Sequence, residues 1–387
     1  MSQLAQSMSR LGTETAFDVL ARAEQLIATG KDVINLGIGQ PDFKTPDHIV
    51  NAAIKALKDG HHGYTPANGI KLLRETIAVD LAQRHNVGVD PNHVVVVPGG
   101  KVTMFFAILM FGEPGVEILY PNPGFPIYES AINFTGAKAI PIPLREDNAF
   151  SFDADTVLGL ITTKTRLIIL NSPANPTGGY VPKDQLDRLA AGLEAHPHVN
   201  ILSDEIYSQM LYGDRRHTTM LSYENLRDRV IMLDGWSKTY AMTGWRLGYA
   251  VWPAHLVEPA TRLAINCHSC VNTAAQYAGI AALTGPQDKI QEMVTAFDER
   301  RQVIVDALNN LPGFRCTDPG GAFYAFPNIT ETGMTATEAQ NKFLDSAGVA
   351  TVAGTSFGSY GEGYVRFSYA NSIENIKKAI NRIRQCL

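Results

Sequence analysis

Leu233-Asp-Gly-Trp-Ser-Lys-Thr-Tyr-Ala-Met-Thr-Gly-Trp-Arg-Leu-Gly-Tyr249 joins two short apolar runs through a segment that contains a single lysine, Lys238. Ser237 precedes this lysine, and Arg246 follows it eight residues later. A lysine amine can condense with a carbonyl to form a Schiff base, and serine and arginine side chains can hold a phosphate next to it. The combination of a carbonyl-reactive lysine and a phosphate site predicts binding of pyridoxal phosphate.

The quoted stretch ends a series of short apolar runs that are rich in β-branched residues. These runs are Val94–Val97, Val116–Tyr120, Ala139–Ile142, Leu167–Leu170, Val199–Leu202, Val230–Leu233 and Leu247–Val251. Amphipathic stretches such as Lys183–Leu193 separate several of them. Apolar strands that alternate with helices are typical of a mostly parallel sheet covered on both faces. We therefore expect an α/β fold with a mostly parallel seven-stranded sheet between helices, and functional groups at the carboxyl ends of its strands.

The two ends of the chain have a different pattern. Residues 1–45 contain one helical pattern, Ala16–Thr29, followed by a turn-rich segment. The C-terminal part contains a long helical pattern, two short strand-like runs and a closing helix, at Pro286–Leu311, Gly320–Phe326, Gly363–Tyr369 and Ser372–Cys386. We expect a large cofactor-binding domain over residues 46–285 and a smaller α+β domain over residues 286–387, which the N-terminal segment joins.

The composition argues against several classes of partner. The 387 residues carry a formal net charge of −5, and no basic run stands out, so a nucleic-acid surface is not expected. No apolar run approaches the length of a membrane span, and residues 1–10 lack the apolar core of a signal peptide. We expect a cytoplasmic protein.

Four cysteines are too few and too scattered for a disulfide framework in a chain of this length. Cys267-His-Ser-Cys270 has the spacing of a metal or redox pair, but a second ligand pair is not visible in the sequence. We therefore expect thiols and no metal site. Gly37-Ile-Gly39 is followed by Gln-Pro-Asp and does not complete a dinucleotide fingerprint, which argues against a nucleotide-binding dehydrogenase.

A candidate phosphate site lies at Val94-Val-Val-Val-Pro-Gly-Gly-Lys-Val-Thr103, where an apolar strand breaks at glycines and enters a helix. Free amides at the start of a helix face an anion, and glycine leaves room for its approach. Gly100 and Lys101 would donate these backbone N–H groups. An ordinary strand-to-helix turn is the alternative, and the companion residues Ser237 and Arg246 favour a phosphate.

A candidate site for the cofactor ring lies in Val199-Asn-Ile-Leu-Ser-Asp-Glu-Ile-Tyr207. Asp204 ends an apolar run, and a carboxylate paired with a pyridinium nitrogen keeps that nitrogen protonated, so that the ring becomes an electron sink. Tyr207 could donate to the ring's phenolic oxygen. The alternative is that Asp204 caps the next helix.

Three further residues are candidates because of their position. Asn175 lies in a loop stiffened by prolines after Leu167–Leu170, where the alternative is a turn in which asparagine bonds to its own backbone. Phe125 follows another apolar run and either stacks on a planar ring or fills the core. Arg366 alternates with apolar neighbours and either clamps a substrate carboxylate or forms a surface salt bridge.

These motifs together resemble one family. They are Gly39-Gln-Pro-Asp-Phe43, Tyr64-Thr-Pro-Ala-Asn-Gly69, Gly99-Gly-Lys101, Asn175-Pro-Thr-Gly178, Ser203-Asp-Glu-Ile-Tyr207, Ser237–Gly248, Gly321-Ala-Phe-Tyr324 and Val365-Arg-Phe-Ser-Tyr369. In this order they resemble the class I/II aminotransferases, which are pyridoxal-phosphate enzymes of fold type I, and the prokaryotic aspartate aminotransferase subgroup in particular. The resemblance extends over nearly the whole chain.

The resemblance implies a role for each candidate. Lys238 would carry the cofactor as a Schiff base and then move the proton between the substrate's α-carbon and the cofactor's C4′. The cofactor would be bound by Gly100, Lys101, Ser237 and Arg246 at the phosphate, Asp204 at the pyridine nitrogen, Asn175 and Tyr207 at the phenolic oxygen, and Phe125 on the ring face. Arg366, Asn175 and the backbone of Gly39 would bind the substrate's α-carboxylate.

The resemblance also implies a homodimer with shared active sites, because in this family Tyr64 reaches the phosphate of the neighbouring subunit. One departure affects the substrate. Aspartate-specific relatives usually have Tyr-Trp-Val-Ser-Tyr where this chain has Gly124-Phe-Pro-Ile-Tyr128, so Phe125 lacks an indole N–H for a distal carboxylate. Lys101 and His268 are alternative groups for that carboxylate.

We therefore expect a transaminase that moves an α-amino group between an L-amino acid and a 2-oxo acid. The resemblance implies an aspartate, glutamate and 2-oxoglutarate type, with aromatic or neutral amino acids as alternatives. A β-lyase and an enzyme similar to aminocyclopropane-carboxylate synthase share the same cofactor cradle. A non-enzymatic regulator is disfavoured, because the N-terminal extension is short and not basic.

Overall fold

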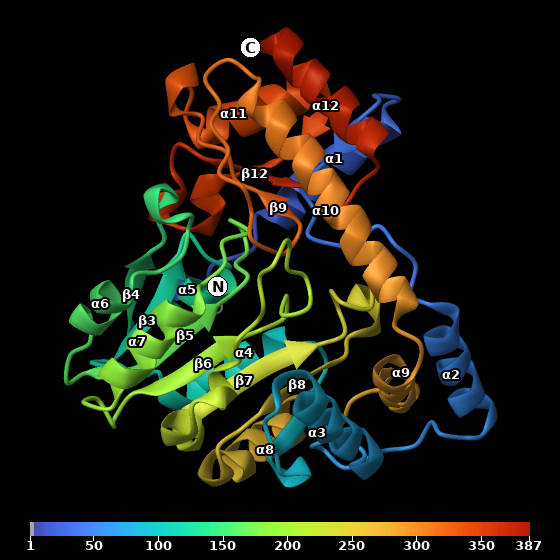
Figure 1. Ribbon diagram of the computed structural model, residues 1–387, viewed down its shortest axis with the longest axis vertical. Helices are drawn as coiled ribbons and strands as arrows, with labels where there is room; N and C mark the ends of the chain where they lie inside the picture. The colour runs from blue at the N-terminus through green and yellow to red at the C-terminus, as the bar shows by residue number, and fades with distance from the viewer. Residues whose placement is uncertain (1–3) are drawn as a thin grey trace.

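The computed structural model describes residues 4–387, whose elements form a lower group around a large sheet and an upper group of helices and short strands (Figure 1). The sheet contains β2 (Val94–Val97), β3 (Glu117–Asn122), β4 (Lys138–Pro143), β5 (Thr165–Asn171), β6 (Asn200–Asp204), β7 (Val230–Gly235) and β8 (Gly248–Val251), in the order β2-β8-β7-β6-β5-β3-β4. Among these strands, β8 alone runs opposite to the other six. The prediction of a mostly parallel seven-stranded sheet is confirmed.

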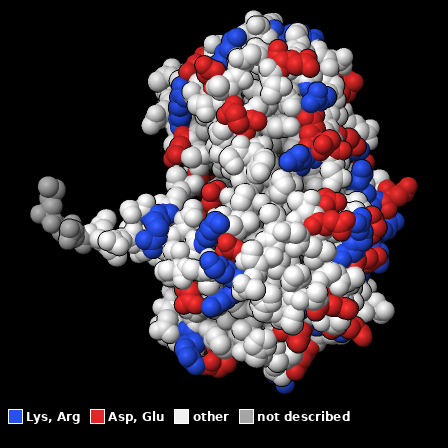
Figure 2. Space-filling view, turned by 90° about the vertical axis from the view of Figure 1, so that its left-hand side faces the viewer, with Lys and Arg blue, Asp and Glu red and all other residues white. Residues whose placement is uncertain are grey.

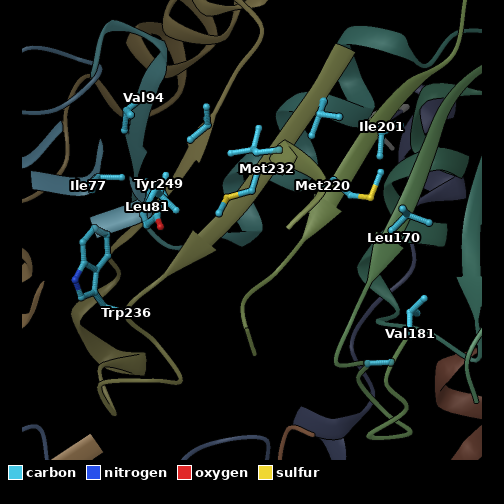
Figure 3. Close-up of a cluster of buried hydrophobic side chains, with 14 of the residues drawn as sticks. Ile77, Leu81, Val94, Leu170, Val181, Ile201, Met220, Met232, Trp236 and Tyr249 are labelled. Atoms are coloured by element: carbon cyan, nitrogen blue, oxygen red, sulfur yellow. The ribbon is translucent and has the colours of Figure 1, made fainter. Parts of the chain in front are cut away.

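Helices cover both faces of this sheet. They are α2 (Asp47–Lys58), α3 (Lys71–His85), α4 (Lys101–Phe111), α5 (Ile127–Thr135), α6 (Ala154–Gly159), α7 (Lys183–Leu193), α8 (Ala254–His268) and α9 (Thr273–Thr284). Because successive side chains of a strand point to opposite faces, Val94 and Val96 belong to the apolar cluster that also contains residues of α3, α7 and α9, whereas Val95 and Val97 belong to the cluster that also contains residues of α4, α5 and α8. Figure 3 shows the first face, where Ile77 and Leu81 of α3 lie beside Tyr249 of β8.

The upper group has its own apolar core. It contains α1 (Ala16–Ala28), α10 (Asp288–Asn309), α11 (Ala336–Lys342), α12 (Ile373–Cys386), β1 (Ile34–Asn35), β9 (Tyr324–Ala325), β10 (Val349–Ala350), β11 (Val352–Ala353) and β12 (Val365–Ser368). Phe297 and Ile304 of α10 pack there with Ile380 of α12 and Phe367 of β12. Figure 1 shows α10 running from the lower group to the upper one.

The N-terminal segment is tied to the C-terminal part by a short parallel pair. Ile34 of β1 is in register with Val349 of β10, and Ala23 of α1 packs against Leu344 and Ala350. Gly37 and Gly39 follow β1: the carbonyl oxygen of Gly37 accepts from Arg366 of the upper group, and that of Gly39 accepts from Lys238 of the lower group.

The remaining regular elements are short. Single turns of 3-10 helix cover η1 (Gln6–Arg10), η2 (Pro91–His93), η3 (Glu146–Asn148), η4 (Met220–Ser222), η5 (Glu224–Arg229), η6 (Thr243–Trp245), η7 (Thr330–Thr332), η9 (Gly354–Phe357) and η10 (Ser359–Gly361), and η8 (Phe343–Ala347) is a π-helical turn. Figure 2 shows the first described residues projecting from the body, and acidic and basic side chains interspersed on the face in view. Within residues 4–387, each helix is too short or too polar to cross a membrane.

Candidate active site

A cavity of about 500 Å³ lies where the carboxyl ends of β5, β6 and β7 face the upper group. This volume lies in the range of roughly 300–1,000 Å³ that is usual for small-molecule sites. The cavity brings together eleven of the residues predicted from the sequence, namely Gly39, Gly100, Lys101, Phe125, Asn175, Asp204, Tyr207, Ser237, Lys238, Arg246 and Arg366. Residues far apart in the sequence therefore meet at the sheet edge where parallel strands place functional groups.

Two predicted residues lie elsewhere in the single chain. Tyr64 is 94% exposed and borders a separate surface hollow together with His62 and Cys270. His268, which the sequence offered as a group for a distal carboxylate, packs its ring against Phe106 at the end of α8, outside the cavity. The interpretation of His268 is wrong, because the last turn of α8 directs its ring into the core beside the sheet.

Lys238 lies in the loop after β7, within the cavity. Its Nζ donates to the carbonyl oxygen of Gly39 at 2.5 Å and lies 5.9 Å from the centre of the Tyr207 ring. Desolvation, followed by the positive charge of Arg366, lowers the pKa of Lys238 to about 8, while Glu14 opposes the shift. A neutral amine, which can act as a nucleophile or a base, is therefore accessible near neutral pH.

Asp204 ends β6 and is 2% exposed. The hydroxyl of Tyr128 donates to its Oδ2 at 2.6 Å, and the backbone N–H of Ile206 donates to Oδ1 at 3.2 Å. Burial raises the pKa of Asp204 to about 6, although the hydrogen bond from Tyr128 acts in the opposite direction. The alternative that Asp204 caps a helix is wrong, because the segment after β6 is a turn. A protonated ring nitrogen here would supply the counter-charge for this buried carboxylate.

The start of α4 has the features of an anion site. Gly99 has φ +90°, and a Cβ at this residue would collide with the guanidinium of Arg246, so glycine lets the arginine lie against the strand-to-helix turn. Arg246 Nη1 donates to the carbonyl oxygen of Thr243 at 2.8 Å. The first N–H groups of a helix have no partner within the helix, so Gly100 and Lys101 present backbone donors beside this cation. A phosphate fits this arrangement.

Arg366 is 3% exposed in β12 and faces the cavity. One Nη donates to Asn175 Oδ1 at 2.9 Å, and the other donates to the carbonyl oxygen of Gly37. Its guanidinium lies 4.7 Å from the ring centre of Tyr324, and its Nε has no hydrogen-bond partner within residues 4–387. The alternative of a surface salt bridge is wrong, because β12 turns this side chain inward. A buried guanidinium with an unused donor is suited to a carboxylate.

A hydrogen-bond chain holds the remaining candidates. Asn171 Nδ2 donates to the carbonyl oxygen of Asp204 at 3.1 Å, and its Oδ1 accepts from the backbone N–H of Asn175 at 3.0 Å. The hydroxyls of Tyr207 and Tyr324 are 2.8 Å apart. Asn175 is thereby fixed at two points: its backbone N–H is bound by Asn171, which is bound to Asp204, and its side-chain oxygen is bound by Arg366.

Among the lining residues that were not predicted as site residues, four form side-chain hydrogen bonds: Glu14, Tyr128, Asn171 and Tyr324. Tyr128 and Tyr324 lie within segments that the sequence analysis singled out, and Asn171 follows the apolar run Leu167–Leu170, but their hydrogen bonds join segments distant in sequence. Glu14 Oε2 accepts from Lys101 Nζ at 2.8 Å, and Lys101 Nζ lies 5.2 Å from the centre of the Phe125 ring. Glu14 lies outside any motif, so the sequence offered no signal for it.

Comparison with known proteins decides the family. The family model described as aminotransferase class I and II matches residues 31–383. The chain belongs to the class I and II aminotransferases. This aminotransferase is 38% identical over 365 residues to an aspartate aminotransferase of Pyrococcus abyssi, with 93% of each chain covered.

Solved structures share the whole architecture. The aminotransferase superposes on the Thermus thermophilus aspartate aminotransferase solved with maleate with a TM-score of 0.95, at 31% identity and with 100% of each chain covered. It also matches an aromatic aminotransferase of Pyrococcus horikoshii with a TM-score of 0.89, at 36% identity, covering 94% of this chain and 98% of the other. The fold is therefore fold type I, and the enzyme depends on pyridoxal phosphate.

Proposed function

We propose that the cavity around Lys238 is the site at which this aminotransferase moves an α-amino group from an L-amino acid to a 2-oxo acid. The observation that carries the proposal is the convergence of three chemically distinct groups in one cavity, an amine with a lowered pKa, a buried carboxylate and a buried guanidinium. The polar groups of the cavity fit the three polar parts of pyridoxal phosphate, which are its phosphate, its ring nitrogen and its phenolic oxygen.

The cofactor would be held at each of these ends. The backbone N–H groups of Gly100 and Lys101, the hydroxyl of Ser237 and the guanidinium of Arg246 would hold the phosphate. Asp204 would pair with the ring nitrogen, Asn175 and Tyr207 would contact the phenolic oxygen, and Phe125 would lie on the ring face. When bound, pyridoxal phosphate supplies a conjugated ring that stabilises negative charge developing on the substrate's α-carbon.

The chain's own residues carry out the remaining steps. With the cofactor bound, Asp204, kept from water, would hold a proton on the ring nitrogen. Lys238 Nζ would accept the proton released by the substrate's α-carbon and return it in the transfer of the amino group, a task that suits an amine with a pKa of about 8. Tyr128 orients Asp204 through its hydroxyl.

The substrate's α-carboxylate would lie on Arg366, beside Asn175 and the backbone of Gly39. A guanidinium binds a carboxylate with two parallel hydrogen bonds, which fixes the α-carbon relative to Lys238. Relatives named for aspartate and for aromatic amino acids share this fold at similar identity. The relative named for aspartate supports a dicarboxylate substrate of the aspartate, glutamate and 2-oxoglutarate type. The relative named for aromatic amino acids supports aromatic or neutral amino acids as alternatives.

The proposal includes a cytoplasmic homodimer. Tyr64 is exposed in the single chain, as are the apolar side chains Leu4, Met8 and Leu11 of the N-terminal segment. A second copy that covers this surface would bring Tyr64 to its partner's phosphate site. The four cysteines are free thiols, which is usual in a reducing compartment. The domain boundaries at residues 45 and 285 belong to the same proposal and are supported by the separate cores of the two groups.

A half-reaction assay tests the proposed function. Amino acids are added singly to the holoenzyme without an oxo acid, and the change of the cofactor absorbance and the 2-oxo acid formed are followed. We expect one equivalent of 2-oxo acid per site from the wild type and none from Lys238→Ala. Continued release of pyruvate and ammonia without an acceptor would instead indicate a β-lyase.

A further inference from the structure

The wall of the cavity beside Phe125 contains an ion pair that the proposed chemistry does not use. Glu14 Oε2 and Lys101 Nζ are 2.8 Å apart, and both side chains line the cavity. The side chains are 21% and 42% exposed, respectively, so the pair lies at the mouth of the cavity. The backbone of Lys101 belongs to the phosphate site, which leaves its side chain free for another task.

The pair is held in place from both sides. Lys101 is the first residue of α4, and its ammonium lies 5.2 Å from the centre of the Phe125 ring. Glu14 follows a segment that is anchored to α5, where the N–H of Gly12 donates to Ser130 Oγ at 2.9 Å and Arg10 donates to the carbonyl oxygen of Asn133 at 2.8 Å. The carboxylate therefore reaches Lys101 from a fixed backbone.

The cavity that the pair borders also has an apolar part. Ala16 and Phe17 of α1, Ile38 and Met104 line the same cavity. A substrate side chain that extends away from Lys238 toward this wall meets apolar surface and a cation whose charge is already balanced by Glu14. A second carboxylate on the substrate would have to displace Glu14 from Lys101, and the two carboxylates would repel each other.

We propose that Glu14 determines side-chain selectivity by competing with a substrate's distal carboxylate for Lys101. A dicarboxylate must break this pair to reach Lys101, so Glu14 weakens the preference for dicarboxylates over amino acids with uncharged apolar or aromatic side chains. This inference rests on the proposed function and adds to it a residue that restrains the use of dicarboxylates.

The test compares kcat/KM for aspartate and for phenylalanine in the wild type and in Glu14→Gln. Glutamine keeps the size of the side chain but releases the charge of Lys101, so the ratio of aspartate to phenylalanine is expected to rise by about tenfold or more, the effect of one charge-assisted hydrogen bond. The exposed acid Asp18 of α1 lies outside the cavity lining, so Asp18→Asn is the matched control and should leave the ratio unchanged.

A double variant identifies the group that Glu14 restrains. In Glu14→Gln/Lys101→Met the gain for aspartate should be lost, because the cation that would receive the distal carboxylate is gone. An unchanged ratio in Glu14→Gln, or a gain that survives in the double variant, would overturn the proposal. A wild type that converts neither amino acid would instead contradict the proposed function, so the two failures are distinguishable.

Discussion

Burial in the cavity favours the neutral forms of Lys238 and Asp204. The pKa of Lys238 falls to about 8, and that of Asp204 rises to about 6. In both residues desolvation is the largest cause, because the loop after β7 and the end of β6 exclude water from an ionisable group. The charged forms of both groups are therefore destabilised in the cofactor-free protein, and a charged cofactor would offset this cost.

The cost of ionising the buried Asp204 carboxyl predicts that Asp204→Asn raises the free energy of unfolding of the cofactor-free protein, and that the gain depends on pH. A carboxyl whose folded pKa is raised contributes stability that is fully present below its unfolded pKa of 3.8 and is lost as pH rises through about 6. At pH 8 the ionised carboxylate therefore costs about 3 kcal/mol, from 1.36 kcal/mol per pKa unit. Urea unfolding should show that Asn recovers much of this at pH 8 and distinctly less at pH 5.

The control for this comparison is Asp155→Asn, at an exposed position of α6. It should give a small change of stability at both pH values. A gain from Asp204→Asn that is the same at pH 5 and pH 8 would show that the carboxyl of Asp204 does not titrate in this range. In the holoenzyme the same substitution should strongly reduce transamination, because asparagine cannot pair with a protonated ring nitrogen.

The positions of the functional groups follow from the order of the elements. Asn171 ends β5 and Asp204 ends β6, and in parallel strands these ends meet at one edge of the sheet. Lys238 follows β7, the next strand in the sheet. Because β8 is antiparallel to both β2 and β7, these two strands run in the same direction, and the loop between β2 and α4, which contains the proposed phosphate site, lies at the same edge.

Much of this could be predicted from the sequence, because the strands of the large sheet are continuous apolar runs. The helix expected at Lys183–Leu193 is α7 with the same bounds, and Ser372 caps α12 as the start of the expected closing helix. The antiparallel direction of β8 could not be predicted, since an apolar run has no direction. The two-residue strands β1 and β10 are too short for a pattern.

The contacts between distant elements could not be predicted for a different reason. The hydrogen bond from Tyr128 to Asp204 and the ion pair of Glu14 with Lys101 depend on how α5 and the N-terminal segment pack against the sheet. Residue types and spacing carry no information on that approach. For the same reason the sequence left a surface salt bridge open for Arg366: the alternation of polar and apolar residues does not show which face of β12 is buried.

At the scale of the whole molecule, Tyr64 lies outside the cavity of the single chain with its ring exposed, and the proposed dimer would give it a role in the site of the second subunit. The projecting N-terminal residues in Figure 2 offer apolar side chains for the same contact. The ion pair of Glu14 lies between this segment and the active-site cavity. The proposed dimer contact and the proposed selectivity would therefore depend on neighbouring parts of one N-terminal segment.

Shared sites predict complementation between two inactive variants. Lys238→Ala and Tyr64→Ala are unfolded together, refolded as a mixture and assayed for transamination. If Tyr64 acts in the partner's site, a mixed dimer contains one site with both Lys238 and Tyr64, and activity should reappear at roughly a quarter of the wild-type level, since half of the dimers are mixed and each has one intact site. Tyr64 acting within its own subunit would leave the mixture as inactive as its components.

The most direct test of the central claim, that Lys238 carries the cofactor, is to locate the cofactor on the chain. Sodium borohydride converts a linkage between a lysine and pyridoxal phosphate into a stable secondary amine, and peptide mass spectrometry then identifies the modified residue. We predict one phosphopyridoxyl group per chain in the wild type, attached to Lys238. In Lys238→Ala this position should carry no such group. Modification of another lysine, such as Lys101, or an unmodified Lys238 in active holoenzyme would contradict it.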